Sequence, residues 1–377
     1  MDDPCAVLSD YFDLPLSNSN YSSWNQSCDY TSLLWAGQRV ETGDRAYFTA
    51  RVFIGMSLAC IMLTCGVGNF LFIVLLIRCS KLRTVTNLLI ANLAVSDLIV
   101  AVICCPFEMD YYVVKELSWS FGQLLCSSVN YLRTVSLYVS TNALLAIAVD
   151  RYLVIVHPLK PRMKYQTAYC VLAGVWLISI LIALPSAYFT TETMFGTFKE
   201  APGVTNQKVY CVQIWTADKA LFYKSYFLFL FAVEFLLPVV AMSCCYIQIC
   251  RELWFKDLPG IQTEQLRNRL RARRKTVLVL VGILTMYILC WTPYYTFSIV
   301  RDFFPSLLLK VTHSVSLYYV VECFAMINSV INTIFFIFIK NNTGKYVKKV
   351  LLRRWKPVQA PEKTAVDCPS SLQPGIE

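Results

Sequence analysis

Seven long apolar runs alternate with polar segments along this 377-residue chain. A run of about 20 apolar residues is long enough to cross a bilayer as a helix. The seven runs are Val52–Ile77, Leu88–Pro106, Leu124–Val149, Ala168–Phe189, Ser225–Cys250, Thr276–Val300 and Val315–Ile339. Because lipid cannot hydrogen-bond to the backbone, each run is predicted to be an α-helix. The pattern therefore predicts an all-α membrane protein built as a seven-transmembrane helix bundle.

The segments outside the runs divide the rest of the chain. Residues 1–50 are predicted to form an extracellular N-terminal segment, and residues 51–340 the transmembrane domain. In residues 341–356 the apolar side chains recur at helical spacing among lysines and arginines, which predicts a short amphipathic helix on the inner leaflet. Residues 357–377 are rich in proline and serine and are expected to be a disordered cytoplasmic tail.

The basic residues near the span ends predict the orientation. They follow spans one, three and seven and precede span six: Arg78, Lys81, Arg83, Arg151, Lys160, Arg162, Lys164, Arg267–Lys275, Lys340, Lys345, Lys348, Lys349, Arg353 and Arg354. That side should be cytoplasmic, where the bases also contact anionic lipid. We therefore expect a multi-pass plasma-membrane protein with its N-terminus outside and its C-terminus inside.

The N-terminal segment has features that agree with an outer location. Asn20 and Asn25 each begin a sequence that fits the N-glycosylation acceptor pattern. No apolar run occurs within the first thirty residues, so no cleavable signal peptide is expected. Residues 1–46 hold seven acidic and two basic residues, although the whole chain carries a net charge of +10. Cys5 and Cys28 could pair with each other, but nothing in the sequence decides it.

Composition excludes several classes of protein. With 56% hydrophobic and 15% charged residues, the chain has too little charge to cover a soluble domain of this size. The bases flank apolar runs, whereas a nucleic-acid-binding protein would gather them on a water-facing surface. The chain has no CxxC pair and only two histidines, which lie on opposite sides, so neither a zinc site nor a catalytic triad is expected.

Polar residues inside apolar spans are costly and therefore indicate function. Six of them lie at similar depth in spans one, two, three and seven: Asn69, Asp97, Ser140, Asn328, Ser329 and Asn332. We expect them to form one polar network in the middle of the bundle. Two interpretations remain open, which are hydrogen bonding between helices and a sodium ion beside Asp97.

Several motifs in spans three to six, the first of them at the inner end of span three, resemble those of rhodopsin-like G-protein-coupled receptors. They are Asp150-Arg151-Tyr152, Trp176, Pro238, Tyr246 and Cys290-Trp291-Thr292-Pro293. The resemblance covers about residues 50–355. It implies a receptor that activates a heterotrimeric G protein.

The resemblance also implies roles for single residues. Pro293 should kink span six, because proline removes a helix hydrogen bond, and Trp291 should shift when a ligand binds. Arg151, next to Asp150 and Tyr152, should face the G protein. Cys126 should form a disulfide with Cys211 in the second outer loop, which is reasonable in an oxidising compartment.

Two positions depart from the receptor pattern. Span seven reads Asn332-Thr333-Ile334-Phe335-Phe336, where many relatives have Asn-Pro-x-x-Tyr, so the inner switch at Asn332 must work differently. Many relatives also place an acid at the foot of span six, but here that position is Arg273, which would repel Arg151. We therefore expect no ionic lock between spans three and six.

Four charged residues lie in the outer half of the bundle: Glu108, Arg133, Arg301 and Glu322. One interpretation is an internal salt bridge, such as Arg133 with Glu322. The other is a water-filled pocket for a ligand that carries its own charges. An amine receptor would have an aspartate in place of Arg133, and a retinal protein would need a lysine in span seven. A peptide or small protein therefore fits better as the ligand.

Longer stretches resemble the prokineticin receptors: Asn87–Asp97, Cys104–Val114, Val129–Asn142, Lys224–Phe229, Arg251–Lys256, Arg301–Pro305 and Tyr319–Cys323. This resemblance implies secreted cysteine-rich prokineticins as ligands, with signalling mainly through Gq, phospholipase C and calcium. It also implies that Glu108, Asn130, Arg133 and Arg301 line the ligand pocket. Glu322 is added to this set only because of its position in the outer half of span seven. The N-terminal segment and residues 195–207 do not share this resemblance.

Other classes fit the sequence less well. A receptor for a different neuropeptide is the main alternative, because the unlike regions would touch a large ligand. A transporter would be expected to show repeats and broken helices, and the chain shows neither. A membrane enzyme would need a catalytic cluster that the two histidines cannot supply.

Overall fold

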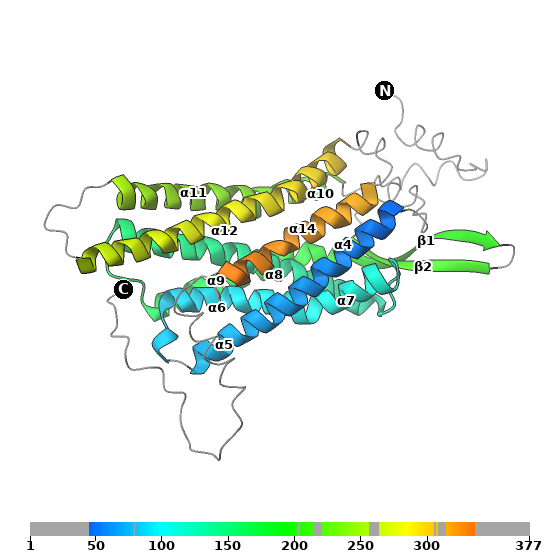
Figure 1. Cartoon of the computed structure of the whole chain (residues 1–377). Coiled ribbons are helices and arrows are strands. Elements are labelled where there is room, and N and C mark those ends of the chain that lie inside the picture. Colours follow the sequence, from blue (N-terminus) through cyan, green and yellow to red (C-terminus); the bar gives the residue numbers. More distant parts are fainter. Residues whose placement is uncertain are drawn as a thin grey trace, which may run out of the picture.

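The computed structural model describes residues 45–78, 80–201, 204–213, 220–255, 264–304, 307 and 314–335. Within these residues, seven helices are long and apolar enough to cross a membrane, as predicted. They lie side by side as one elongated bundle, from which a β-hairpin projects at one end (Figure 1). The chain is an all-α membrane bundle in which this hairpin is a small addition.

Each span is one helix or a series of helical segments joined end to end. Three spans are interrupted or extended by short π-helical turns, labelled η. In chain order the spans are α4 (Arg45–Ile61), η1 (Met62–Val67) and α5 (Gly68–Arg78); α6 (Val85–Ile99), η3 (Val100–Cys104), α7 (Cys105–Met109) and η4 (Asp110–Val114); α8 (Gly122–Val156); α9 (Tyr165–Phe189); α10 (Ala220–Leu230), η6 (Phe231–Leu236), α11 (Leu237–Cys250) and η7 (Arg251–Phe255); α12 (Glu264–Phe303); and α14 (Ser314–Ile334). A 3-10 turn, η2 (Ser80–Leu82), follows span one, and Thr84 caps α6 by accepting a hydrogen bond from the Asn87 backbone.

Most helices extend beyond the apolar runs that predict them. Helix α4 begins at Arg45, so helix replaces the last residues of the expected N-terminal segment 1–50. Helix α12 begins at Glu264 and includes the basic stretch Arg267–Lys275 before its apolar part. Helical backbone satisfies its own hydrogen bonds, so it continues past the hydrocarbon region where polar side chains meet the headgroups. The predicted amphipathic helix 341–356 and the tail lie outside the described residues.

The helices differ in how much of their surface is inside the bundle. In the apolar part of span two 61% of residues are buried, whereas in α9 only 17% are. Large exposed side chains such as Leu177, Leu181 and Tyr188 lie on α9. Helix α9 is therefore peripheral, and its apolar surface suits contact with lipid.

The buried side chains form two main clusters at different depths. The first contains Leu89, Ile147 and Tyr287 and joins spans one, two, three, five, six and seven. The second contains Leu58, Cys105 and Trp119 and joins spans one, two and seven with the outer end of span three. Together they leave the outer part of the bundle between spans three, five, six and seven to polar and aromatic side chains, which form the site described below.

The second outer loop contains an antiparallel hairpin that the sequence analysis did not predict. Strand β1 (Thr190–Ala201) pairs with β2 (Val204–Gln213), beginning with Thr190 opposite Gln213 and with two register shifts nearer the tip. The β-branched and aromatic residues of β2 favour a strand. Because the apolar run of β2 is short and lies among polar residues, its pattern does not distinguish a strand from a loop.

The hairpin is fixed to the outer end of α8. A disulfide joins Cys211 on β2 to Cys126 on α8, the pairing that the family resemblance implied. The side chain of Gln123 donates to the Thr190 carbonyl at 3.0 Å and accepts from the Glu192 backbone at 2.6 Å. The Trp119 backbone donates to the Val209 carbonyl at 2.6 Å. These bonds hold β2 across the outer end of the bundle.

Because the bundle core and its lipid face differ in burial, the same substitution should have different effects at Leu89 and Leu181. Leu89 is fully buried, and its change to Ala should lower the free energy of unfolding by about 2–5 kcal/mol, because it leaves a cavity. Leu181 is more than half exposed, and its change to Ala should alter stability by less than about 1 kcal/mol. Thermal and denaturant unfolding in detergent measure both. Equal effects would contradict the described packing.

Candidate functional site

A cavity of about 240 Å³ opens into the outer half of the bundle. Spans two and three, the outer end of α9, spans five, six and seven and both strands of the hairpin contribute to its wall. Residues 211–213 of β2 lie along it, so the disulfide-anchored strand forms part of its cover. Of the predicted ligand residues, Asn130, Arg133, Arg301 and Glu322 line this cavity.

Arg133 is the centre of the charged group in the cavity. Its Nη1 lies 2.5 Å from Glu322 Oε1, and its Nε lies 3.4 Å from Glu108 Oε1. Glu108 and Glu322 are both buried, and the Arg133 side chain is only 16% exposed. One guanidinium therefore lies between two carboxylates from different spans, which gives this group a formal charge of −1. The expected ion pair exists, and the cavity exists beside it.

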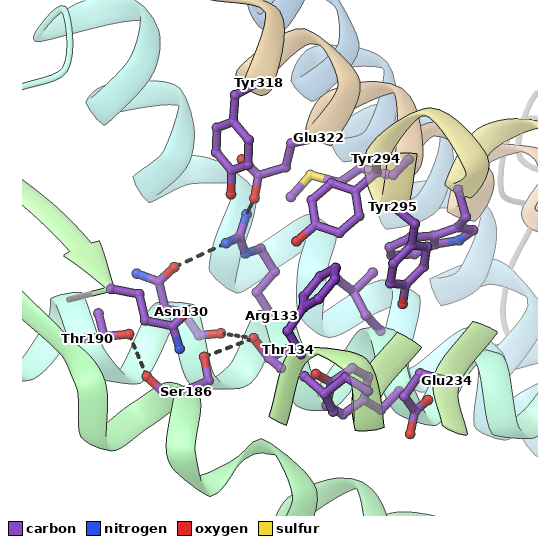
Figure 2. A pocket seen from close by; sticks show the side chains of 18 of the residues that line it. Asn130, Arg133, Thr134, Ser186, Thr190, Glu234, Tyr294, Tyr295, Tyr318 and Glu322 are labelled. Carbon is purple, nitrogen blue, oxygen red and sulfur yellow. Dashed lines mark hydrogen bonds and ion pairs between the residues drawn. The ribbon is translucent and has the colours of Figure 1, made fainter. Parts of the chain in front are cut away.

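Asn130 positions this group from one helical turn away. Its Oδ1 accepts from Arg133 Nη2 at 3.2 Å (Figure 2). Its Nδ2 donates to the Cys126 carbonyl at 3.0 Å. Nδ2 also lies 3.2 Å from the Cys211 sulfur. The amide thus connects the arginine to the disulfide, so the hairpin and the charged group support each other.

Arg301 forms a second charged group at the outer end of α12. Its guanidinium bonds to Asp302 at 2.6 Å and donates to the Tyr223 hydroxyl at 2.7 Å. The Tyr223 hydroxyl donates to Asp302 at 2.8 Å, and the guanidinium lies over the Tyr318 ring at 5.5 Å. Asp302 and Tyr223 were missed by the sequence analysis. The sequence Arg301-Asp302 was a signal for the first, but no pattern pointed to Tyr223.

An aromatic cluster forms the deeper wall of the cavity. Trp291, a predicted switch residue, lies against the rings of Tyr287, Tyr294 and Tyr295 at centroid separations of 5.8–6.1 Å. All four side chains line the cavity, and Pro293 lies within α12 beside them. A ligand that entered deeply would touch Trp291 next to the proline that interrupts the hydrogen bonds of the helix.

Below the cavity, the mid-bundle polar residues are buried and partly bonded. Ser140 donates to Asp97 Oδ1 at 3.1 Å, and Ser329 is a further hydrogen-bonding partner of Asp97. Asn69 donates to Thr333 at 3.0 Å, and Thr333 donates to the Ser329 carbonyl at 2.8 Å. Thr333 was not predicted to take part. These bonds join spans one, two, three and seven.

Some buried atoms of this region have no hydrogen-bond partner among the described residues. They are Asp97 Oδ2, Asn328 Oδ1, Asn332 Oδ1 and Asn332 Nδ2. Carboxylate and amide oxygens are the donors that hard cations prefer, and buried water could satisfy the same atoms. The oxygen donors therefore fit the sodium ion suggested for Asp97, and they fit water equally well.

The inner end of α8 carries a compact charged group. Arg151 Nη2 lies 2.9 Å from Asp150 Oδ2, and Thr86 donates to the same oxygen at 3.0 Å. Arg151 also donates to the Thr86 hydroxyl, so span two helps to hold it. Tyr152 packs edge-on against His157. Within the described residues no ion pair joins Arg151 to α12, and Arg273 is exposed.

Other predicted sites lie outside the described residues. These are Asn20 and Asn25 of the glycosylation patterns, and Cys5 and Cys28. No group of three or more histidine, cysteine, aspartate or glutamate side chains that could hold a metal ion occurs in the part of the chain that the structure describes.

Comparison with known proteins agrees with this arrangement. Residues 68–336 match the 7 transmembrane receptor (rhodopsin family) domain. The chain is 59% identical to prokineticin receptor 2 of Homo sapiens over 356 residues, which are 94% of this chain and 91% of that protein. It is 62% identical to prokineticin receptor 2 of Mus musculus over 326 residues, covering 86% and 84%. It is 63% identical to prokineticin receptor 1 of Bos taurus over 315 residues, covering 84% and 79%.

The buried pair of Arg133 and Glu322 should be energetically coupled. Arg133→Gln and Glu322→Gln, alone and together, form a double-mutant cycle whose coupling in the free energy of unfolding should be about 1–3 kcal/mol. The surface pair of Arg51 and Glu116 is the control, since it is more exposed and should couple by less than about 1 kcal/mol. Additive effects in the buried pair would show that the pair does not hold spans three and seven together.

Proposed function

We propose a ligand for this chain, which belongs to the rhodopsin family of seven-transmembrane receptors and within it to the prokineticin receptors. The proposed ligand is a secreted cysteine-rich peptide of the prokineticin type. As a G-protein-coupled receptor it is a multi-pass membrane protein and not an enzyme. Binding of the peptide at the outer face is proposed to activate a heterotrimeric G protein at the inner face.

The outer cavity is the observation that carries the proposal. Arg133 and Glu322 line one part of it and Arg301 lines another, while Glu108 does not line the cavity and acts on it only as an ion-pair partner of Arg133. A peptide has a cationic terminus and polar amides, and it can make contacts with both regions at once. Its folded body would rest on the hairpin and on the acidic residues 1–50, which attract a basic partner.

The inner end supplies the surface for the G protein. Arg151 is held by Asp150 and Thr86 at the end of α8, and α12 extends beyond the apolar region with a series of basic residues. Outward movement of α12 would uncover Arg151 and present these bases, including Arg273, to the G protein. The same bases can contact anionic lipid while the receptor is at rest. Gq, acting through phospholipase C and calcium, is the proposed pathway.

The proposed topology places the hairpin and the N-terminus outside the plasma membrane and the C-terminus inside. Basic residues at the ends of α5 and α8 and at the start of α12 support it. A disulfide on the hairpin side agrees with an oxidising outer environment. Asn20 and Asn25 are proposed to carry glycans on that side.

Cells that express the chain should raise cytosolic calcium when a prokineticin is added. Arg301→Ala should increase the concentration needed for half-maximal response by about tenfold or more, because buried arginines are frequent binding hot spots. Glu108→Ala should act in the same direction through Arg133. Lys224→Ala is the matched control, since Lys224 is basic, near the outer end and outside the cavity. No response to any prokineticin despite normal surface expression would contradict the ligand, and a response to another neuropeptide would replace it.

Replacing Arg273 on α12 by an acidic residue should create an ion pair between α12 and Arg151. Arg273→Glu is therefore expected to lower basal signalling by holding α12 against α8. Arg273→Gln removes the repulsion without adding a partner and should have a smaller effect. Ligand-independent inositol phosphate formation, normalised to surface expression, measures both. Unchanged basal signalling in Arg273→Glu would contradict the expectation that an acidic partner for Arg151 on α12 stabilises the resting receptor.

A further inference from the structure

Glu234 is a buried carboxylate at the deep end of the outer cavity that the proposed function does not use. It lies in the π-helical turn η6 of span five, lines the cavity and is only 2% exposed. Its Oε1 has no hydrogen-bond partner among the described residues, and its Oε2 is 3.5 Å from Asn142 Nδ2. A buried, underbonded carboxylate is costly unless a partner compensates it.

We propose that Glu234 is the anchor of a second subsite in this cavity, which binds an ammonium or guanidinium group attached to an apolar or aromatic body. The proposal rests on the proposed function only in taking the cavity to be a ligand site. It assigns the ligand a cationic group that passes the Arg133 group and ends beside span five.

The backbone around Glu234 is arranged to present this side chain. A π-helical turn shifts the register of a helix by one residue and often occurs at functional sites. Here the Tyr287 hydroxyl of α12 donates to the Glu234 carbonyl at 2.8 Å, which fixes the turn against span six. The Tyr287 hydroxyl also lies 3.4 Å from Thr141 on α8. Three spans therefore hold the turn, while carboxylate Oε1 is left for another partner.

No cation of the described residues neutralises Glu234. The ion pairs of Arg133 go to Glu108 and Glu322, and those of Arg301 go to Asp302. Asn142, the neighbour of Glu234, is nine residues after Arg133 on α8, a separation of about 13 Å along the helix axis. Figure 2 shows Glu234 on the side of the cavity away from the Arg133 group. The two acidic regions of the cavity are therefore distinct.

The surroundings of Glu234 select the chemistry of the ligand. Tyr287, Trp291 and Tyr295 line this end of the cavity, and Phe235 packs on Tyr295 at 4.8 Å between ring centroids. Aromatic faces attract cations and also accept an apolar ligand body. A metal ion would find a single carboxylate here, with only neutral hydroxyl groups in the rest of the lining at this end. An organic cation, by contrast, uses both the charge and the rings.

Binding of a small probe to the full-length receptor, purified in lipid nanodiscs, tests the subsite. The probes are 2-phenylethylammonium and the uncharged 2-phenylethanol, with affinities measured by ligand-observed NMR titration. The wild-type receptor should bind the ammonium about 10- to 100-fold more tightly than the alcohol, the range of a charged hydrogen bond. Glu234→Gln should abolish this preference. Glu116→Gln, the same chemical change at a partly exposed carboxylate outside the cavity, should retain it.

Either of two results would overturn the proposal. One is a wild-type receptor that binds the two probes equally, and the other is a Glu234→Gln receptor that keeps the preference. The second would mean that the cationic group binds elsewhere and that Glu234 is not its anchor. Neither result depends on the peptide ligand, so a failure here is distinguishable from the absence of a calcium response to prokineticins.

A labelling experiment on the unmodified receptor covers the case in which Glu234→Gln does not fold. Photolysis of bound 2-(4-azidophenyl)ethylammonium should label peptides that contain η6 or residues 287–295, and excess 2-phenylethylammonium should prevent this labelling. Mass spectrometry identifies the labelled peptides. Labelling confined to other segments, or labelling that the competitor does not reduce, would overturn the proposal.

Discussion

The structure of the outer half depends on one guanidinium, that of Arg133, which is largely enclosed by the bundle. Arg133 lies between Glu108 and Glu322, so three spans meet through one positive and two negative charges. In an apolar interior such a group is tolerated only when its geometry is good and its remaining hydrogen bonds are satisfied. Glu108 Oε2 has no partner among the described residues, so the group is not fully satisfied within them. An excess of negative charge beside a cavity is therefore a constraint that a charged ligand can relieve.

The same constraint explains why the hairpin matters for the site. Asn130 bonds to Arg133 and also contacts the disulfide sulfur of Cys211. The cover of the cavity and its central charge are thus connected through one amide side chain. If a bound peptide moved the hairpin, Arg133 would be displaced through Asn130. Because Arg133 pairs with Glu322, the displacement would also reach span seven, whose deeper part carries Ser329 and Asn332. These contacts reach α14 at Glu322, and the mid-bundle residues Ser329 and Asn332 lie farther along the same helix.

Much of this arrangement could be predicted from the sequence, because bilayer physics imposes a strong pattern. The seven helices follow from the length of the apolar runs, and buried charges such as Asp97 and Arg133 stand out against them. The partners of these charges could not all be predicted. No sequence pattern marks the partners Tyr223, Thr333 and Thr86. Only tertiary packing brings them to Arg301, Asn69 and Arg151, respectively.

The position of Glu234 in the cavity also could not be predicted from the sequence. Glu234 lies within the apolar run of span five, but its place at the deep end of the cavity depends on a π-helical turn that the periodicity of the sequence does not indicate. The hairpin was missed for a related reason, since part of what holds it in place is its contacts with Cys126, Gln123 and Trp119, which lie far away in the sequence. Local pattern therefore predicts the scaffold, and long-range contacts decide which atoms meet in the site.

The central claim is that the sign and position of the Arg133 charge determine binding at the outer face. The most direct measurement is equilibrium binding of a labelled prokineticin to the receptor in which Arg133→Glu and Glu322→Arg are combined. This exchange keeps an ion pair between spans three and seven, and circular dichroism with thermal unfolding confirms that the receptor is folded. The account predicts that the folded variant loses peptide binding by at least about tenfold, a difference of 1.4 kcal/mol. Unchanged affinity in the folded variant would contradict it.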